Sequence, residues 1–323
     1  MPKILHTARY TGLPWEILKS VVPAEFSVET LKELTYESLL RQAVDADYLL
    51  VSGRLPIDEG VLSAAKHLKM IQRTGVGTEM LDTEALKRHN IPVYVNAGVN
   101  AHSVAEHTMT LILACMKRLP QINQDTHHGV WQKQQQGLTT HELFGKTIAL
   151  VGLGNIGRLV AAMLQPFGVK ILYTDVYRQS EEAEKQLGLT YCESFEEMLS
   201  NADVLSFHCP LTPENTEMLN KSTIAKMRKG AIVVNTARGK LVNPNDLYDA
   251  LQSGQIVSAA LDTHYEEPFK DGYKLAGLDN VILTPHIGGL SYEAFQSMMA
   301  GAIENIVAFE NGKMDVIIDK RII

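Results

Sequence analysis

Short apolar runs alternate with longer segments of helical pattern along most of the chain. The runs are rich in valine, isoleucine and leucine, which is typical of strands that are buried on both faces of a parallel sheet. The segments between them are long enough to form crossover helices. The alternation therefore predicts an α/β fold built on parallel sheets. Strands are predicted at residues 48–51, 70–71, 93–95, 147–151, 169–173, 204–207, 231–234, 257–261 and 281–283.

Several helix ends carry their own signals. Ser103 with Glu106 has the spacing of a capping box ahead of an apolar helix. Asn243 stands before a proline, which is typical of a helix start, and Gly254 follows where that helix would end. Ser291 is placed to cap a last long helix. These signals place helices between the predicted strands and after the last of them.

The chain has 323 residues, more than one hydrophobic core usually holds, so two domains are expected. We predict a discontinuous domain made of residues 1–101 and 291–323. A second domain is predicted at residues 102–290. The chain would cross from one domain to the other near Ser103 and return near Ser291.

The composition argues against several classes of function. An apolar fraction of 45% and a charged fraction of 21% are those of a globular protein. The formal net charge is −7, so no basic field is available to bind nucleic acid or an anionic membrane. No apolar run approaches the roughly 20 residues of a membrane span, and the first residues lack the pattern of a signal peptide.

The three cysteines, Cys115, Cys192 and Cys209, stand far apart in the chain. Without CxxC pairing they predict neither a disulfide framework nor a structural zinc site, and a cytoplasmic location is expected. The neighbouring residues His127 and His128 have no acid or cysteine at ligand spacing. We therefore expect no metal.

A glycine-rich turn follows the predicted strand at 147–151. Gly152, Gly154 and Gly157 form a G-x-G-x-x-G pattern, and a helical pattern begins directly after it. Glycines in this context permit a tight turn and close approach of the backbone to a pyrophosphate. The N-terminus of the helix offers unpaired N–H groups and a partial positive charge to the phosphates. The turn therefore predicts a dinucleotide site.

Asp175 stands at the end of the next predicted strand. A carboxylate at this place accepts hydrogen bonds from the ribose hydroxyls and repels a 2′-phosphate, so NAD is favoured over NADP. Arg178 lies close by in the sequence and could soften that preference. The alternative is that Asp175 is a solvated loop residue.

Three chemically useful side chains follow three later strands: Arg238, Glu267 and His286. Because ligands bind outside the carboxyl ends of parallel strands, these residues are predicted to converge beside a nicotinamide. The guanidinium would hold a substrate carboxylate and polarise its carbonyl. The imidazole would donate or accept the proton, and the glutamate would fix the tautomer of the imidazole. Each residue taken alone could be a solvated surface group; together they predict hydride transfer on a 2-keto or 2-hydroxy acid.

With these motifs the chain resembles the D-isomer-specific 2-hydroxyacid dehydrogenase family over nearly its whole length. The family's N-x-x-R-G turn is matched by residues 235–239, its D-x-x-x-x-E-P run by residues 262–268 and its T-P-H-I-[GA]-G run by residues 284–289. Residues 75–77 look like its loop that holds the substrate carboxylate. Asn100 and the residues after it look like its hinge.

The resemblance implies two Rossmann-like domains, a flavodoxin-like substrate domain and a doubly wound NAD-binding domain, with NAD and substrate in an interdomain cleft. It also implies a homodimer joined through the NAD-binding domain. Residues 121–144 would supply part of that contact, and Trp131 stands among them. For Trp131, packing within its own domain is the alternative.

The motifs and the resemblance together imply two sets of binding residues. Arg238, Glu267 and His286 are the expected catalytic residues, and Asp262 is expected to accept from the nicotinamide carboxamide. Cys209 is expected to be a small neighbour of the cofactor and not a nucleophile. The full cofactor set is Gly152, Gly154, Asn155, Ile156, Gly157, Asp175, Cys209, Pro210, Asn215, Thr236, Ala237, Arg238, Asp262 and His286. The substrate set is Ser52, Gly53, Arg54, Val76, Gly77 and Arg238.

The chain resembles the phosphoglycerate dehydrogenase and the hydroxypyruvate or glyoxylate reductase branches, in a short form without a regulatory domain. The substrates considered are 3-phosphoglycerate, hydroxypyruvate, glyoxylate and D-lactate. Arg54 could meet a substrate phosphate or second carboxylate, or it could be solvated. The intact Glu267-Pro268 pair disfavours the formate dehydrogenase branch. An NAD(H)-sensing binding protein of corepressor type stays open as the alternative function.

Overall fold

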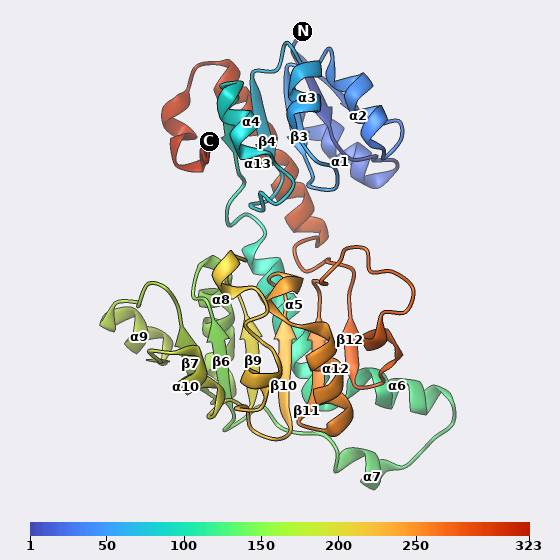
Figure 1. The fold of residues 1–323 in the computed structure, drawn as a ribbon, viewed down its shortest axis with the longest axis vertical. Coiled ribbons are helices and arrows are strands. Elements are labelled where there is room, and N and C mark those ends of the chain that lie inside the picture. Colours follow the sequence, from blue (N-terminus) through green and yellow to red (C-terminus); the bar gives the residue numbers. More distant parts are fainter. The chain divides into compact units, whose positions relative to one another are not determined.

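The computed structural model describes residues 1–323, and the chain divides into two compact units (Figure 1). Unit 1 comprises Met1–Asn100 and Tyr292–Ile323, and unit 2 comprises Ala101–Ser291. Every strand pairing within the two sheets is parallel, as the alternating pattern predicts. The predicted fold class, two α/β domains with parallel sheets, is confirmed.

Unit 1 contains a five-stranded sheet of order β2-β1-β3-β4-β5, the flavodoxin-like order. Its strands are β1 (Lys3–His6), β2 (Ser27–Thr30), β3 (Tyr48–Val51), β4 (Met70–Arg73) and β5 (Val93–Tyr94). Its α-helices are α1 (Leu13–Val21), α2 (Tyr36–Ala43), α3 (Glu59–Ala64), α4 (Thr83–Arg88) and α13 (Tyr292–Glu310).

The apolar residues of unit 1 fill two core layers, one on each face of the sheet. Leu49 belongs to the layer under α2, α3 and α4, and the next residue, Leu50, belongs to the layer under α1 and α13. Successive side chains of a strand point to opposite faces, so a strand covered on both faces must be apolar throughout. The sequence is therefore apolar without interruption at residues 48–51, because helices cover both faces of β3.

Unit 2 contains a seven-stranded sheet of order β12-β11-β10-β9-β6-β7-β8. The order reverses between β6 and β9, which is the switch point where ligands bind in such sheets. Its strands are β6 (Thr147–Val151), β7 (Lys170–Thr174), β8 (Leu189–Tyr191), β9 (Val204–Phe207), β10 (Ala231–Asn235), β11 (Ile256–Leu261) and β12 (Val281–Leu283). Its α-helices are α5 (Ala101–Lys117), α6 (Leu119–His127), α7 (Lys133–Gly137), α8 (Asn155–Leu164), α9 (Glu181–Leu187), α10 (Phe195–Leu199), α11 (Lys221–Ile224) and α12 (Pro244–Ser253).

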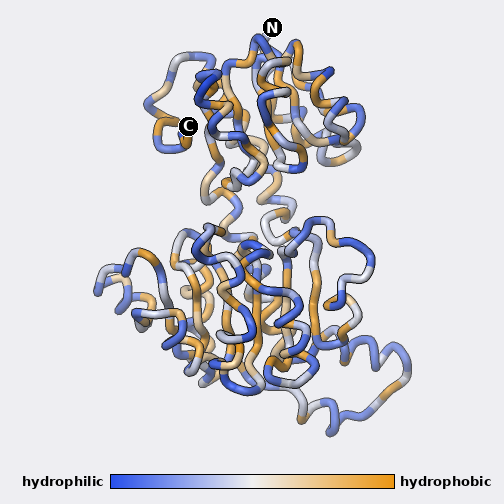
Figure 2. The backbone as a smooth tube through the Cα atoms, viewed as in Figure 1, coloured by the Kyte–Doolittle hydropathy of each residue, from blue (hydrophilic) through white to orange (hydrophobic).

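Helices cover both faces of the sheet of unit 2. One layer packs α5 and α8 on the sheet, and the other packs α10, α11 and α12. Figure 2 shows the consequence in the chain: the strands are apolar, and the polar residues gather in the loops and along outer helix faces. No helix is both long enough and apolar enough to cross a membrane.

All nine predicted strands are present, with bounds shifted by at most two residues, and the structure adds β1, β2 and β8. The predicted start of α12 is confirmed, because Asn243 accepts from the main-chain N–H groups of Asn245 and Asp246. The predicted capping box at Ser103 is wrong. Helix α5 begins at Ala101, and the hydroxyl of Ser103 instead donates to the carbonyl of Gly288 at 2.6 Å.

Helices α6 and α7 form an arm that extends beyond the β12 edge of the sheet of unit 2 (Figure 1). The arm, residues 119–144, exposes large apolar side chains. Trp131 is 81% exposed and Leu138 is 85% exposed, and Phe144 is also exposed. The alternative that Trp131 packs within its own domain is therefore wrong.

Candidate active site

The two candidate acid–base residues meet at the carboxyl edge of the sheet of unit 2. Glu267 lies in the loop after β11, and His286 follows β12, which pairs with β11. The Nδ1 atom of His286 lies 2.7 Å from Oε2 of Glu267. The side chains are 48% and 37% exposed, respectively, so the pair is accessible. Since a carboxylate only accepts, Nδ1 carries a proton and Nε2 is the nitrogen that can exchange one with a ligand.

The hydrogen bond shifts both groups towards the ionised pair. The hydrogen bond that His286 donates to Glu267 raises the pKa of His286 above its ordinary value, although burial and the positive charge of Arg238 work against this. Burial would raise the pKa of Glu267, but hydrogen bonds from His286 and from the main-chain N–H of His264 lower it. The imidazole is therefore held closer to its protonated form than a solvated histidine at the same pH.

Asp262 holds the segment that carries His286. The residue is 1% exposed, and its carboxylate accepts from Thr284 Oγ1 at 2.6 Å, from Ile287 N at 2.9 Å and from Gly288 N at 2.8 Å. Burial opposes ionisation, but these bonds and one from His107 lower the pKa of Asp262 to about 2. Oδ2 of Asp262 accepts only the bond from Gly288 N and keeps a lone pair, so the expected contact with a nicotinamide carboxamide stays a prediction. The carboxylate also holds the segment of His286. This structural role was not predicted.

Arg238 follows β10, the next strand of the same sheet edge. The side chain of Asn235 shapes its turn by donating to the carbonyl of Arg238 at 2.8 Å and accepting from Ala237 N at 3.0 Å. A Cβ atom added at Gly239 would collide with the carbonyl of His264, so this turn packs directly against the loop after β11. The structure thus brings Arg238, Glu267 and His286 to the ends of three adjacent strands.

The glycine-rich turn has the geometry of a phosphate cradle. Gly152 has a φ of 93°, and a Cβ there would lie 2.8 Å from the main-chain nitrogen of Cys209. A Cβ at Gly157 would collide with the carbonyl of Gly152, whereas the space beside Gly154 is open. Helix α8 begins at Asn155 without a side-chain cap, so its first N–H groups are available to an anion. These residues fit a dinucleotide pyrophosphate.

Asp175 directly follows β7, beside the glycine-rich turn. Its carboxylate accepts from Leu153 N at 2.6 Å and from Tyr177 N at 3.2 Å, one bond on each oxygen. Each oxygen keeps a further lone pair for a ribose hydroxyl. Arg178 turns to Glu184 in a two-pronged ion pair with distances of 2.9 and 3.0 Å. In this arrangement the guanidinium of Arg178 is bound to Glu184 and is not positioned to bind a 2′-phosphate.

The loop after β9 completes the cofactor side of unit 2. Burial raises the pKa of the Cys209 thiol to about 11, which does not suit a nucleophile. The amide of Asn215 donates to the carbonyl of Pro210 at 2.8 Å and accepts from Thr212 N at 2.7 Å. Asn215 thus shapes this loop with contacts inside it. Two further predicted residues, Thr236 and Ala237, lie buried between β10 and Arg238.

The predicted substrate loops belong to unit 1, except for Arg238. Ser52, Gly53 and Arg54 follow β3, and Val76 and Gly77 follow β4. Arg54 and Val76 are exposed. Both loops lie at the carboxyl ends of neighbouring parallel strands.

One buried arginine that holds the loops at this edge of unit 1 was not predicted. Arg73, the last residue of β4, is buried, and its guanidinium donates to the carbonyls of Gly77 at 2.6 Å and of Val51 at 3.1 Å. A Cβ atom at Gly53 would lie 2.9 Å from the same guanidinium. Arg73 therefore links the end of β3 to the loop after β4. The signal that could have found it is an arginine ending an apolar strand directly before a Gly-x-Gly loop.

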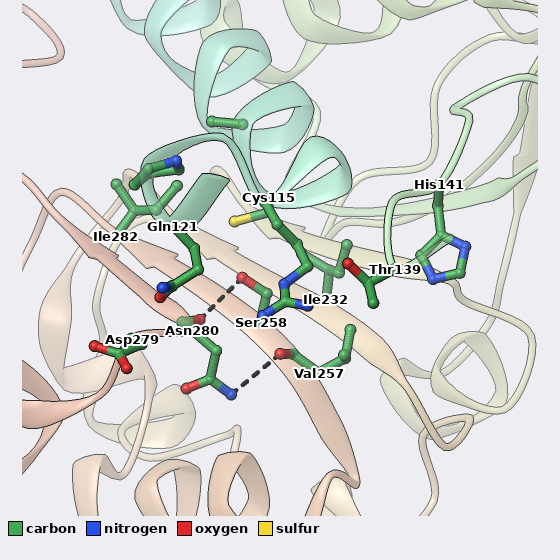
Figure 3. A pocket seen from close by; sticks show the side chains of 13 residues that line it. Cys115, Gln121, Thr139, His141, Ile232, Val257, Ser258, Asp279, Asn280 and Ile282 are labelled. Atoms are coloured by element: carbon green, nitrogen blue, oxygen red, sulfur yellow. Dashed lines mark hydrogen bonds between the residues drawn. The ribbon is translucent and has the colours of Figure 1, made fainter. Parts of the chain in front are cut away.

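A separate shallow hollow in unit 2 has no part in this site (Figure 3). Cys115, Gln121, His141 and Asp279 are among the residues that line it. Ile232 and Val257, which also line it, lie at the amino ends of their strands, the end of the sheet opposite to His286. Ligands of open parallel sheets bind at the carboxyl ends, so the hollow is not the active site.

Comparisons with known proteins agree with this geometry. A family model described as "D-isomer specific 2-hydroxyacid dehydrogenase, NAD binding domain" matches residues 109–288. The glyoxylate reductase of Thermococcus kodakarensis is 35% identical over 320 residues, covering 97% of this chain and 94% of the relative. The D-3-phosphoglycerate dehydrogenase of Methanocaldococcus jannaschii is 38% identical over 288 residues. That match covers 89% of this chain but 54% of the relative, so the chain spans about half of that relative's length.

Solved structures of similar proteins share the fold of this chain. The TT0316 protein from Thermus thermophilus superposes with a TM-score of 0.86 at 33% identity, covering 96% of this chain and 97% of that one. An NAD-dependent formate dehydrogenase from Staphylococcus aureus, solved in complex with NAD, has a TM-score of 0.83 at 28% identity, covering 96% of both chains. The chain belongs to the D-isomer specific 2-hydroxyacid dehydrogenase family and is an NAD-dependent oxidoreductase.

Proposed function

We propose that the protein interconverts a small D-2-hydroxy acid and its 2-keto acid, with Arg238, Glu267 and His286 as its catalytic residues. The observation that carries the proposal is the 2.7 Å bond between His286 Nδ1 and Glu267 Oε2, with Arg238 on the adjacent strand end. Bound NAD supplies or receives the hydride at the C2 carbon of the acid.

His286 moves the proton. In the direction of reduction, Nε2 of the protonated imidazole donates to the carbonyl oxygen of the keto acid as that oxygen becomes a hydroxyl. In the direction of oxidation, neutral Nε2 accepts the hydroxyl proton. Glu267 keeps the proton of Nδ1 in place and stabilises the imidazolium, because its hydrogen bond raises the pKa of His286.

Arg238 orients the acid. Its guanidinium is planar and always charged, and it can pair with both oxygens of a carboxylate at once. It also places positive charge beside the carbonyl oxygen that receives the proton. The turn that Asn235 shapes keeps Arg238 at the end of β10, next to the loop of Glu267.

Unit 2 is the proposed NAD-binding domain and unit 1 the proposed substrate-binding domain. The N–H groups around Gly154, Asn155, Ile156 and Gly157 would hold the pyrophosphate. Asp175 would accept from the ribose hydroxyls, which favours NAD over NADP. Gly152, Cys209, Pro210, Asn215, Thr236 and Ala237 would line the rest of the dinucleotide site.

The substrate loops of unit 1 suit an anion. The N–H of Ser52 already donates to Thr7 Oγ1 at 3.2 Å, so the main-chain N–H groups at 53–54 and 76–77 would meet the anion. The guanidinium of Arg73 behind these loops adds positive charge. Arg54 is exposed at the tip of its loop and would meet a phosphate or a second carboxylate. Glyoxylate and hydroxypyruvate are the first substrates to test, because a glyoxylate reductase matches over nearly its whole length. 3-Phosphoglycerate and D-lactate follow.

The arm at residues 119–144 fits a second copy of this chain. Exposed Trp131, Leu138 and Phe144 present apolar surface that a monomer leaves in water, and burying it stabilises an oligomer. We therefore include a homodimer through unit 2 in the proposal. Light scattering after gel filtration should give twice the chain mass, and W131E should shift it towards the monomer. A wild-type monomer at micromolar concentration would contradict this part.

The test of the reaction is NADH oxidation, followed at 340 nm, across a panel of keto acids. We expect turnover with at least one of glyoxylate, hydroxypyruvate or the keto acid of 3-phosphoglycerate, and a much slower rate with NADPH. Tight NADH binding together with no turnover on any acid would contradict the proposal. That outcome would favour the NAD(H)-sensing alternative.

A further inference from the structure

His264 contacts both segments that carry the acid–base pair. It is a buried residue of the loop after β11. Its main-chain N–H donates to Oε1 of Glu267 at 2.9 Å. Its ring nitrogen Nε2 lies 2.9 Å from the carbonyl of Thr284, two residues before His286. None of the motifs that carry the family resemblance depends on the identity of this side chain.

The contacts define the state of the ring. A carbonyl only accepts, so Nε2 of His264 carries the hydrogen. Nδ1 is buried and has no hydrogen-bond partner in the protein. The ring packs edge-on against Phe269 and Tyr273, with centroid distances of 5.1 and 5.9 Å. These contacts hold the imidazole in one orientation.

The carbonyl of Thr284 has a second donor. The main-chain N–H of His286 also donates to it, at 3.0 Å. His286 has a φ of 57°, in the left-handed region that residues with a Cβ seldom adopt. A strained conformation persists only when its surroundings impose it, and these are found most often at functional sites. The orientation of this carbonyl therefore matters for the placement of the imidazole of His286.

We propose that His264 is a positioning residue for the His286–Glu267 pair. Its N–H fixes Oε1 of Glu267, which leaves Oε2 directed at His286. Its ring fixes the carbonyl that holds the main chain of His286. His264 thus positions both partners of the His286–Glu267 hydrogen bond, on which proton transfer depends. The role deepens the proposed function and rests on it.

The decisive substitution is H264F. Phenylalanine keeps an aromatic ring to pack against Phe269 and Tyr273 but cannot donate to Thr284. We expect about a tenfold loss of kcat, because small misplacements of catalytic groups have effects of at least this size. The apparent pKa of His286 should fall by about half a unit, the equivalent of one weakened hydrogen bond. The affinity for NADH should not change.

Two variants give matched comparisons. In H264Q the side-chain amide can reach the same carbonyl, so kcat and the pKa of His286 should return close to wild type. In Y273F the ring that packs on His264 stays and the hydroxyl is lost, so both values should stay unchanged. The charged groups that act on His286 are Glu267, Asp262 and Arg238, and none of these is altered.

The measurements are the pH dependence of kcat/KM and an NMR titration of His286 in protein labelled with ¹³C-histidine. The titration needs no turnover. If the wild type reduces no acid, the proposed function fails and the titration still tests the positioning role. An unshifted His286 in H264F, or equal losses in H264F and H264Q, would overturn the proposal. Should H264F fail to fold, H264L, which also lacks the donor, takes its place. A fall in the pKa of His286 in H264L but not in H264Q supports the proposal, and an unshifted pKa in H264L overturns it.

Discussion

The two units place functional loops at the same end of a parallel sheet but hold them by opposite chemistry. In unit 2, carboxylates receive N–H and O–H donors: Glu267 from His264 and His286, and Asp262 from Thr284 and two main-chain groups. In unit 1, a cation donates to carbonyls, since Arg73 reaches Val51 and Gly77.

This difference in hydrogen-bonding groups matches the proposed role of each sheet edge: proton transfer in unit 2 and binding of the acid in unit 1. A carboxylate network keeps an imidazole protonated and oriented, which a proton donor needs. In unit 1 the guanidinium of Arg73 donates to main-chain carbonyls, so main-chain N–H groups of the loops can bind a substrate anion. The positive charge of the guanidinium favours that anion. Changes in unit 2 should therefore alter proton transfer or cofactor choice, whereas changes in unit 1 should alter the binding of the acid.

The largest effect is expected for H286A. Removing the proton donor should lower kcat about a thousandfold, within the range known for general acids and bases. NADH affinity, measured by fluorescence titration, should stay nearly unchanged, because the glycine-rich turn and Asp175 are intact. H128A, a histidine of the arm, serves as the control. Loss of NADH binding in H286A with little loss of kcat would show that His286 belongs to the cofactor site and not to the chemistry.

E267Q should lower kcat about a hundredfold and shift its pH dependence. The hydrogen bond that Glu267 accepts from His286 raises the pKa of His286, and reduction needs the protonated imidazole. The rate of reduction therefore falls as pH rises through that raised pKa. The glutamine variant should move this fall to lower pH. E266Q, at the neighbouring residue, should leave the profile in place. A fall at the wild-type pH in E267Q would contradict the pairing.

The sequence predicted those parts of the site that depend on local chemistry. The turns of Asn235, Gly152 and Asn243 could be predicted because their residue types have strong local preferences. The two buried strands on either side of the switch point, β6 and β9, were also predicted, since strands covered on both faces are apolar throughout. Strands β1, β2 and β8 are mixed in polarity and were missed.

What could not be predicted depends on contacts between distant segments. Ser103 and Glu106 look like a capping box, yet the hydroxyl of Ser103 bonds Gly288, which lies far away in the sequence. Asp262 has the position of a ligand-binding acid, but its carboxylate holds the residues after His286. Arg73 and His264 bond main-chain carbonyls at the ends of neighbouring strands, Val51 and Thr284, and no local pattern marks a side chain for that role.

D175S tests the cofactor side of unit 2, with a smaller expected effect. Removing the charge should weaken NADH binding and improve NADPH binding, so that the preference for NADH narrows roughly tenfold. A charged hydrogen bond contributes about this much, and the repulsion of the 2′-phosphate is lost as well. The measurement is kcat/KM with each cofactor at one acid concentration. D279S, far from the glycine-rich turn, is the control. An unchanged ratio would contradict the ribose contact.

The smallest expected effect belongs to unit 1 and tests the contrast directly. R73K keeps the positive charge but loses the planar fork that spans two carbonyls, so the loops at 52–54 and 76–77 should loosen. KM for the keto acid should rise roughly fivefold, as expected when one or two hydrogen bonds to an anion are weakened. The value of kcat at saturation and the affinity for NADH should stay close to wild type, because the acid–base pair and the glycine-rich turn lie in unit 2. R41K, at an exposed position of α2, controls for the loss of an arginine elsewhere in unit 1. If R73K lowers kcat and leaves KM unchanged, the loops of unit 1 do more than bind the acid, and the division of roles between the two sheet edges is wrong.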